Sequence, residues 1–235
     1  MKSLDESLLA PLAPFRRLDR RQIREILDHA QPLRTERGHD VFTQGDEAAR
    51  FFLLLDGYIR VERLTAEGDR VVQLHIPPGQ LFGIARALGR DTYPASAVAA
   101  ADCVMLWWPA SLWDAFEARY PGFSAEVHRT VGQRFEEINS RVMELATQQV
   151  EQRVASALLR LSRQSGRQTD SGVEIAFPIT RKIISEMTGG TLHSVSRLLA
   201  AWEKARIVES RHRHISVRDP ARLEALSRTG GGAQA

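Results

Sequence analysis

Cysteine is almost absent from the sequence, which has only Cys103 among 235 residues. A single thiol cannot form an internal disulfide, as is typical of proteins in a reducing cytoplasm. It also cannot supply the several thiolates that an iron–sulfur cluster requires, so no such cluster is expected. Cys103 is best explained as a small buried side chain.

Long hydrophobic runs are missing as well. No stretch approaches the roughly 20 apolar residues that cross a bilayer. Acidic residues precede the short apolar stretch near the N-terminus, which is unlike a signal peptide. We therefore expect a cytoplasmic protein that makes no membrane contact.

Sequence signatures of common catalytic sites are also missing. No G-x-S-x-G, P-loop, H-E-x-x-H or paired C-x-x-C pattern is present, and a single cysteine rules out most thiol–zinc sites. The protein is therefore not expected to be an enzyme, and a binding or regulatory role is expected instead.

The net charge is small but unevenly distributed. The formal value is +3, yet residues 151–235 carry 14 Lys and Arg against 8 Asp and Glu, whereas residues 1–150 carry 18 against 21. A basic C-terminal third on an acidic body is typical of a segment that binds nucleic acid, although chance richness in arginine would look the same.

Short apolar runs separated by glycine fill residues 41–108. Gly45, Gly57, Gly68 and Gly79 follow one another at intervals of 12, 11 and 11 residues, and the runs between them partly alternate. Short strands with turns at this spacing predict an antiparallel sandwich or barrel.

A long helix is predicted from about residue 121, where apolar residues recur every three or four positions. The resulting heptad-like seam comprises Val127, Val131, Phe135, Ile138, Val142 and Leu145. Such a narrow seam needs a partner, either the protein's own β domain or a second copy in a homodimer, and we favour the homodimer. A shorter helix is predicted at residues 150–163.

A polar loop is predicted at residues 162–172, followed by a short extended piece and two helices. The hydroxyls of Thr180 and Thr191 can cap these helices. Gly189 or Gly190 supplies the positive φ that the turn between them needs. The apolar side of the second helix is expected to bury Val195, Leu198, Leu199 and Trp202.

A β-hairpin with a basic turn is predicted at residues 207–217. Helix, glycine turn, helix and basic hairpin together predict a winged helix-turn-helix whose second helix enters the major groove of double-stranded DNA. An ordinary helical hairpin with a solvated polar face is the alternative. Base contacts are expected from Leu192, His193, Ser196 and Arg197, because Arg197 can donate twice to a guanine and Leu192 can touch a thymine methyl. Phosphate contacts are expected from Thr180, Arg181, Lys182, Thr191, Ser194, Arg211 and Arg213.

Three stretches resemble the Crp/Fnr superfamily of bacterial transcription regulators. "VFTQGDEAARFFLLLDGYIRV" is similar to its opening β-roll pattern, "PPGQLFG" to its phosphate cassette, and "ITRKIISEMTGGTLHSVSRLLAAWEKARIV" to its DNA-binding signature. The resemblance covers about residues 15–220. It implies an α+β fold with an N-terminal cyclic-nucleotide-binding-type β-roll (jelly roll), a long dimerisation helix and a C-terminal winged helix-turn-helix. We expect these domains at residues 1–120, 121–150 and 151–235.

The resemblance also implies a function. It implies a homodimer that senses a small effector in the β-roll, binds a palindromic TTG-type promoter site and activates transcription. The polar loop at residues 162–172 is the implied contact with RNA polymerase. Two alternatives are a cyclic-nucleotide-type regulatory module and a constitutively active regulator with no bound effector.

The expected effector pocket comprises Gly79, Leu81, Phe82, Gly83, Ile84, Tyr93 and Ser96. Members that bind cyclic nucleotides carry a Glu after the second cassette glycine and an Arg-Ser/Thr pair before the next strand. This sequence has Ile84 and Tyr93-Pro94 at these positions. A cyclic phosphate would therefore lack its charge partner, and we expect no binding of cyclic AMP.

Within the family, "MTGGTLHSVSRLLAAWE", "YPASA" and "SVRDP" are most similar to regulators of nitrite and nitric-oxide metabolism. That branch implies haem as a nitric-oxide sensor. The histidines available before the C-terminal third are His29, His39, His75 and His128, and none lies in a haem-ligand motif. Each is more typical of a surface or structural histidine, so haem ligands are unassigned.

Overall fold

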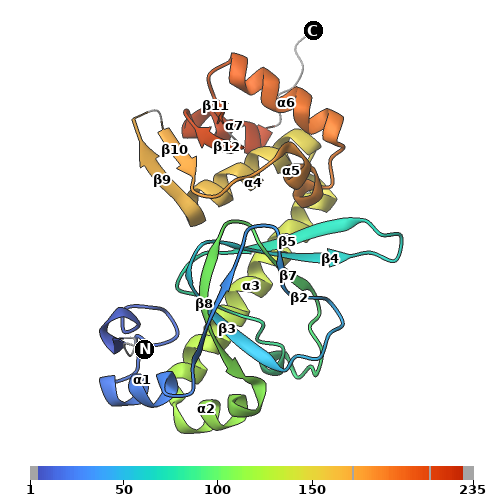
Figure 1. The fold of residues 1–235 in the computed structure, drawn as a ribbon. Helices are drawn as coiled ribbons and strands as arrows, with labels where there is room; N and C mark the ends of the chain where they lie inside the picture. The colour runs from blue at the N-terminus through green and yellow to red at the C-terminus, as the bar shows by residue number, and fades with distance from the viewer. Residues whose placement is uncertain (1–4, 171, 212, 230–235) are drawn as a thin grey trace. The chain divides into compact units, whose positions relative to one another are not determined.

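The computed structural model describes residues 5–170, 172–211 and 213–229, which form two compact units. The first unit comprises the described residues up to 69 together with residues 73–136. The second comprises residues 70–72 and the described residues from 137 onward. Figure 1 labels most of the helices and strands of both units. No helix in the described ranges is long and apolar enough to cross a membrane.

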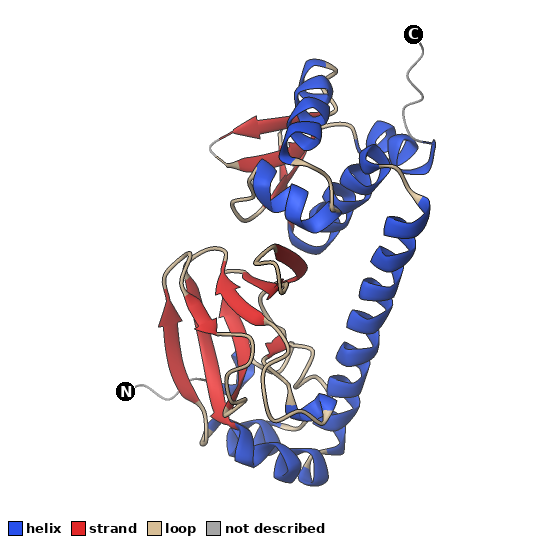
Figure 2. Ribbon diagram, turned by 90° about the vertical axis from the view of Figure 1, so that its right-hand side faces the viewer, coloured by secondary structure: helices blue, strands red, loops and turns tan. Residues whose placement is uncertain are grey.

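The first unit contains two four-stranded antiparallel sheets that enclose a common core (Figure 2). Their strand orders are β1-β8-β3-β6 and β2-β7-β4-β5. The strands are β1 (Gln31–Thr35), β2 (Asp40–Phe42), β3 (Arg50–Asp56), β4 (Ile59–Leu64), β5 (Arg70–Ile76), β6 (Leu81–Phe82), β7 (Ser96–Ala99) and β8 (Cys103–Pro109). Residues 70–72, at the start of β5, belong to the second unit. The predicted β-roll is therefore confirmed. The four glycines that predicted its turns all have positive φ, between 84° and 90°.

Neighbouring residues of β3 and β6 enter two different cores, because successive side chains of a strand point to opposite faces of the sheet. Phe52 and Phe82 lie in the core between the two sheets. Phe51 and Leu81 lie in a second core, which the helices α1 (Arg20–Leu27), α2 (Trp113–Arg119) and the start of α3 (Pro121–Thr147) share with the sheet.

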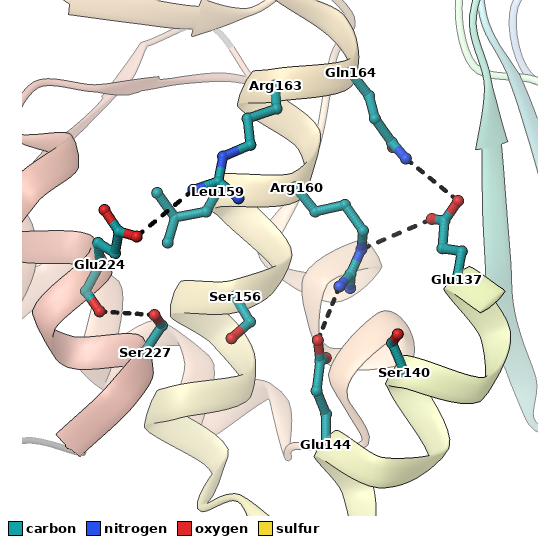
Figure 3. Close-up of a pocket in the computed structure, with 10 residues that line it drawn as sticks. All are labelled: Glu137, Ser140, Glu144, Ser156, Leu159, Arg160, Arg163, Gln164, Glu224 and Ser227. Carbon is teal, nitrogen blue, oxygen red and sulfur yellow. Dashed lines mark hydrogen bonds and ion pairs between the residues drawn. The ribbon is translucent and has the colours of Figure 1, made fainter. Parts of the chain in front are cut away.

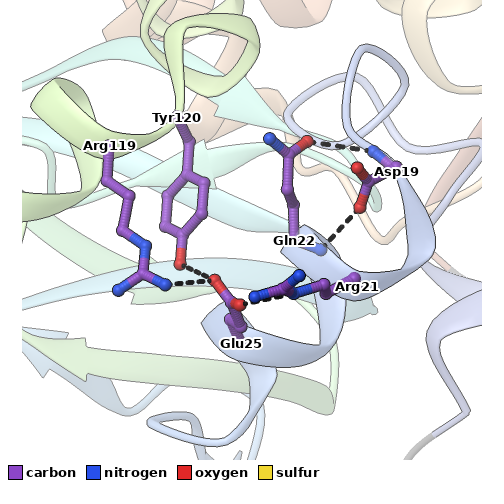
Figure 4. A network of polar contacts seen from close by, with 6 residues as sticks. All are labelled: Asp19, Arg21, Gln22, Glu25, Arg119 and Tyr120. Carbon is purple, nitrogen blue, oxygen red and sulfur yellow. Dashed lines mark hydrogen bonds and ion pairs between the residues drawn. The ribbon is translucent and has the colours of Figure 1, made fainter.

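A polar network on Glu25 joins α1 to the junction of α2 and α3 (Figure 4). Tyr120 donates a hydrogen bond to Glu25 Oε2 at 2.8 Å, and Arg119 Nη2 donates to the same oxygen at 2.9 Å. The hydrogen bond from Tyr120 is the main cause that lowers the pKa of Glu25. Asp19 and Gln22 form a capping box that begins α1.

The helix α3 confirms the predicted long helix, but the seam along it divides into two parts. Val127 is 0% exposed inside the first unit, and Val131 packs against the same core. Val127 is therefore wrong as a dimer contact, since the chain's own β domain covers it. The exposed part of the seam comprises Phe135, Ile138, Val142 and Leu145.

The second unit combines the end of α3 with four helices and one sheet of order β11-β12-β10-β9. The helices are α4 (Val150–Ser165), α5 (Arg181–Thr188), α6 (Leu192–Lys204) and α7 (Pro220–Thr229). The strands are β9 (Gly166–Thr169), β10 (Gly172–Ile175), β11 (Val208–Arg211) and β12 (His214–Val217). The predicted domain boundaries after residues 120 and 150 fall next to the first residues of α3 and α4.

The polar loop predicted at residues 162–172 is wrong over most of its length. The helix α4 continues to Ser165, and residues 166–169 form β9, which pairs antiparallel with β10. Ser171 lies outside the described residues. Apolar and polar residues do not alternate in β9, because this strand lies at the exposed edge of its sheet. Pairing with β10 stabilises it, rather than burial of its side chains.

Candidate nucleic-acid interface

The helix-turn-helix consists of α5 and α6, and local chemistry defines its ends. Thr180 Oγ1 accepts a hydrogen bond from the Ile183 amide at 3.2 Å, and Thr191 Oγ1 accepts one from the Ser194 amide at 3.1 Å. Both predicted N-caps are confirmed. Gly189, with φ of 64°, is the left-handed residue that ends α5.

One face of α6 is buried and the opposite face is open to solvent. Val195, Leu199 and Trp202 are buried as predicted, whereas Leu198 is only half-buried. Of the four residues predicted to contact bases, His193 and Arg197 lie on the other side of the helix and Ser196 lies between the two faces. Leu192 lies seven residues before the buried Leu199, at the first position of the helix. Leu192 is 51% exposed despite its apolar side chain, His193 and Arg197 are exposed, and Ser196 is half-buried.

Several predicted phosphate-contacting cations lie near carboxylates of the same unit. These pairs are Arg181–Glu203 at 3.5 Å, Lys182–Glu186 at 3.9 Å and Arg211–Glu209 at 2.8 Å. Since the three cations are exposed, the pairs are weak and a phosphate can replace the carboxylate. Arg197 has no ion pair within the part of the chain that the structure describes. Its guanidinium is therefore available to a DNA base.

The predicted basic hairpin is confirmed as β11 and β12, in which Arg211 lies opposite His214. His212 lies outside the described residues. Arg213 is exposed and has a positive φ of 70°. Its backbone oxygen accepts a hydrogen bond from the Ile179 amide at 2.7 Å, which ties the wing to the segment just before α5.

The hydroxyls predicted to contact phosphates are already engaged near the start of α6. Thr191 Oγ1, which caps the helix, lies 3.0 Å from Ser194 Oγ and donates to it. This arrangement holds both oxygens beside the first amides of α6, where the helix dipole favours an anion.

The residues predicted to line an effector pocket do not all come together. Phe82 and Tyr93 lie in the core between the two sheets, whereas Leu81 and Ile84 lie in the core shared with the helices. Leu81 and Ile84 therefore do not line the space between the two sheets. Strand alternation separates Leu81 from Phe82, since adjacent side chains of a strand face opposite ways.

Among the other predicted pocket residues, Gly79 and Gly83 have positive φ. Gly79 donates its amide to the Leu54 carbonyl, and the Ser96 hydroxyl accepts from the Gln44 amide at 2.9 Å. These contacts are structural, within β-roll turns and edges.

Stacked aromatic rings occupy the space between the two sheets. The ring centroids of Phe42 and Tyr93 are 3.7 Å apart, and those of Phe52 and Phe82 are 5.0 Å apart. The Tyr93 hydroxyl donates to the Arg50 carbonyl at 2.7 Å. Burial raises the pKa of this phenol, so it stays neutral and holds the stack in place.

Cys103 is buried, as predicted. Its thiol donates to the carbonyls of Tyr58 and Ala101, at 3.4 and 3.2 Å. Burial raises the pKa of the thiol, which disfavours the reactive thiolate.

Three residues that organise the second unit were not predicted from the sequence. On α4, Arg160 reaches two carboxylates of α3, Glu137 at 3.8 Å and Glu144 at 3.1 Å. Figure 3 shows these pairs around a cavity of about 450 Å³, which α3, α4 and α7 line. Since the three residues lie up to 23 positions apart, no local sequence signal predicts the pairing.

Together, the β-roll and the winged helix-turn-helix define a DNA-binding regulator. Residues 32–120 match the cyclic nucleotide-binding domain family, and residues 152–226 match the Crp-like helix-turn-helix domain family. The chain belongs to the Crp/Fnr family of transcription regulators, whose members bind DNA and act as dimers.

Individual relatives agree with this assignment. The fumarate and nitrate reduction regulatory protein of Vibrio cholerae is 24% identical over 88% of this chain and 81% of its own length. A CRP-like cAMP-activated global transcriptional regulator of Mycobacterium tuberculosis is 21% identical over 95% of this chain and all of its own. The structure of FixK2 from Bradyrhizobium japonicum has a TM-score of 0.74 at 21% identity, over 84% of this chain and 96% of that one. The expectation of a regulator rather than an enzyme is confirmed by these relatives.

Proposed function

We propose that this regulator binds a palindromic TTG-type promoter site through the exposed face of α6, with Leu192, His193, Ser196 and Arg197 at the bases. The observation that carries the proposal is the exposed guanidinium of Arg197, which has no ion pair among the described residues, on a helix that is capped by Thr191 and begins with the exposed Leu192. Phosphate contacts then come from the start of α5 and from the wing.

DNA selection tests this proposal directly. When duplexes are recovered from a randomised pool with the purified protein, we expect them to share an inverted repeat whose half-sites lie about 10 base pairs apart, one turn of DNA. A consensus without twofold symmetry, or none at all, would contradict the proposed reading of DNA by a dimer.

We also propose that the regulator activates transcription and contacts RNA polymerase through the exposed strand β9. This segment lies in the region that the family resemblance assigns to that contact. Supporting the proposal, residues 166–168 are exposed and carry the charged side chain of Arg167. Arg167 lies 2.7 Å from Glu174, which holds it on the surface of the hairpin.

Cyclic nucleotides are not the proposed effector. Ile84 lies in the apolar core where a nucleotide-binding relative would have its Glu, and the Tyr93 ring stacks on Phe42. A nucleotide between the sheets would have to displace this ring and would leave its phosphate without a cationic partner.

Calorimetry should therefore show no binding of cyclic AMP or cyclic GMP at millimolar nucleotide. The cAMP-activated relative from Mycobacterium tuberculosis is a suitable positive control under the same conditions. A micromolar dissociation constant for either nucleotide with this protein would overturn the interpretation of the phosphate cassette.

We propose that the regulator belongs to the nitrite- and nitric-oxide-responsive branch, because of its sequence motifs in α5, α6, the wing and residues 93–97. The described residues do not fit the haem that this branch implies. His29, His39 and His128 are exposed, the buried His75 makes other contacts, and four aromatic rings fill the core between the sheets. We therefore assign no haem ligand and derive no step through haem.

A further inference from the structure

Two arginines from other helices cap the C-terminus of α5. The last carbonyls of an α-helix have no partner within the helix. Arg141 of α3 donates from Nη2 to the Met187 carbonyl at 2.7 Å, and Arg153 of α4 donates from Nε to the Thr188 carbonyl at 2.8 Å. Cations at this end also complement the helix dipole.

The same arginines hold the junction between α3 and α4. Arg153 Nη1 donates to the carbonyl of Gln148, at 2.6 Å, directly after the end of α3. Arg141 also donates from Nη2 to the Val72 carbonyl at 2.9 Å, and Val72 belongs to the same unit. The end of α3, the start of α4 and the end of α5 are thus connected through two guanidinium groups.

Arginine is unusual at position 141 because its charged guanidinium group is largely desolvated there. Burial is the main cause that lowers its pKa to about 10, so the group still carries its charge at neutral pH. Desolvating a charged group is costly unless it is well hydrogen-bonded. A methionine of similar length would avoid this cost but could not cap the Met187 carbonyl.

The second connection is steric and involves the two glycines of the turn. A methyl group on Gly190 would lie 2.7 Å from Val150 Cγ1, on the first residue of α4. Valine has little rotational freedom, so this clash cannot be relieved cheaply. Gly189 is needed for its positive φ, but Gly190 does not have one. The missing side chain at Gly190 therefore serves close packing against the α3–α4 junction.

We propose that Arg141 and Gly190 are positioning residues for DNA recognition. Together they lock the turn before α6 to the α3–α4 junction and set the direction in which α6 presents its base-contacting face. Gly190 directly precedes Thr191, the N-cap of α6, so a displaced turn moves the whole helix. This inference rests on the proposed reading of bases by α6.

A double-mutant cycle tests the steric connection. Gly190→Ala should lower affinity for the selected palindrome by about 10- to 100-fold, as expected for overpacking. Val150→Ala removes the clashing Cγ1 and should have an effect below about 3-fold, while the double variant should recover most of the lost affinity. If the two substitutions are simply additive, the packing role of Gly190 is wrong.

A second set of variants tests the guanidinium. Arg141→Met should lower affinity for the palindrome by roughly 10-fold while changing affinity for a scrambled duplex by less than about 3-fold, because non-specific binding depends on phosphate contacts. Arg141→Lys, which can still donate to Met187, should recover part of the loss. The ratio of the two affinities is the decisive quantity, since partial unfolding would lower both equally.

The matched control is Arg160→Met. Arg160 also links α4 to α3, through Glu137 and Glu144. These three charges act on Arg141, but the ion pairs of Arg160 with the two carboxylates do not involve α5 or the turn (Figure 3). It should lower thermal stability and leave the affinity ratio unchanged. An equal loss of ratio in Arg160→Met and Arg141→Met would overturn the positioning role. Loss of base preference in Arg197→Ala, measured in parallel, keeps the proposed function itself separately testable.

Discussion

Replacing Phe135 and Ile138 together with glutamate should convert the dimer into a monomer and abolish tight operator binding. Both side chains are exposed in the single chain, Phe135 by 66%, so the substitutions leave the protomer's own core intact. In a dimer they would place four carboxylates in a contact that otherwise buries apolar surface. Losing the second DNA-binding unit should weaken binding to a palindrome by roughly 10²- to 10⁴-fold.

Sedimentation at micromolar concentration measures the first effect, and titration of the selected duplex measures the second. Met143→Glu is a matched control, because Met143 is exposed on the same helix but falls outside the three- and four-residue spacing of the seam. The control should remain a dimer. A Phe135→Glu/Ile138→Glu variant that stays dimeric would show that the exposed seam is not the dimer contact.

Arg197→Ala should flatten the preference at one base pair of each half-site and cost about 1–3 kcal/mol per half-site. Arg197 lies on the exposed side of α6, opposite the buried Val195 and Leu199. From there its two parallel N–H groups can reach a guanine, which the family resemblance places in a TTG-type half-site. His193 lies one turn earlier, at a position where the family resemblance implies a Glu that accepts from a cytosine amine. Because histidine can also donate, the cytosine requirement should be relaxed while the guanine requirement stays.

Arg211→Ala is the matched comparison for Arg197→Ala. Arg211 lies in the wing, where it pairs with Glu209 and can instead pair with a phosphate. Its loss should weaken all sequences alike and reduce the salt slope by about one. Binding to single-base operator variants at two salt concentrations distinguishes the two residues. An unchanged base preference in Arg197→Ala, or an equal change in Arg211→Ala, would show that the base-contacting face is assigned wrongly.

The sequence by itself determined the features that depend on neighbouring residues. The caps at Thr180 and Thr191, the left-handed Gly189 and the buried stripe of α6 all follow from residues within about one helical turn of each other. The same holds for the glycine turns of the β-roll. These signals are local because hydroxyl capping and positive φ involve only adjacent backbone groups.

Only the tertiary structure decided which of the periodic apolar residues are buried, and which surface buries them. The apolar spacing of α3 is continuous, yet Val127 is buried in its own protomer and Phe135 is exposed. A period indicates that residues share a face but does not identify the surface that covers it. The same holds for Ile84. Its apolar side chain predicts burial, but only the structure shows that it lies in the core shared with the helices rather than between the two sheets.

Contacts between distant segments were likewise invisible in the sequence. The strand β9 is ordered by pairing with β10, although its own residues favour a loop. Arg141 reaches the carbonyl of Met187, 46 positions away, and nothing near either residue marks the pair. Backbone carbonyls are the same at every position, so a side chain that caps one of them leaves no pattern in the sequence, and only the packed helices reveal which carbonyl it meets.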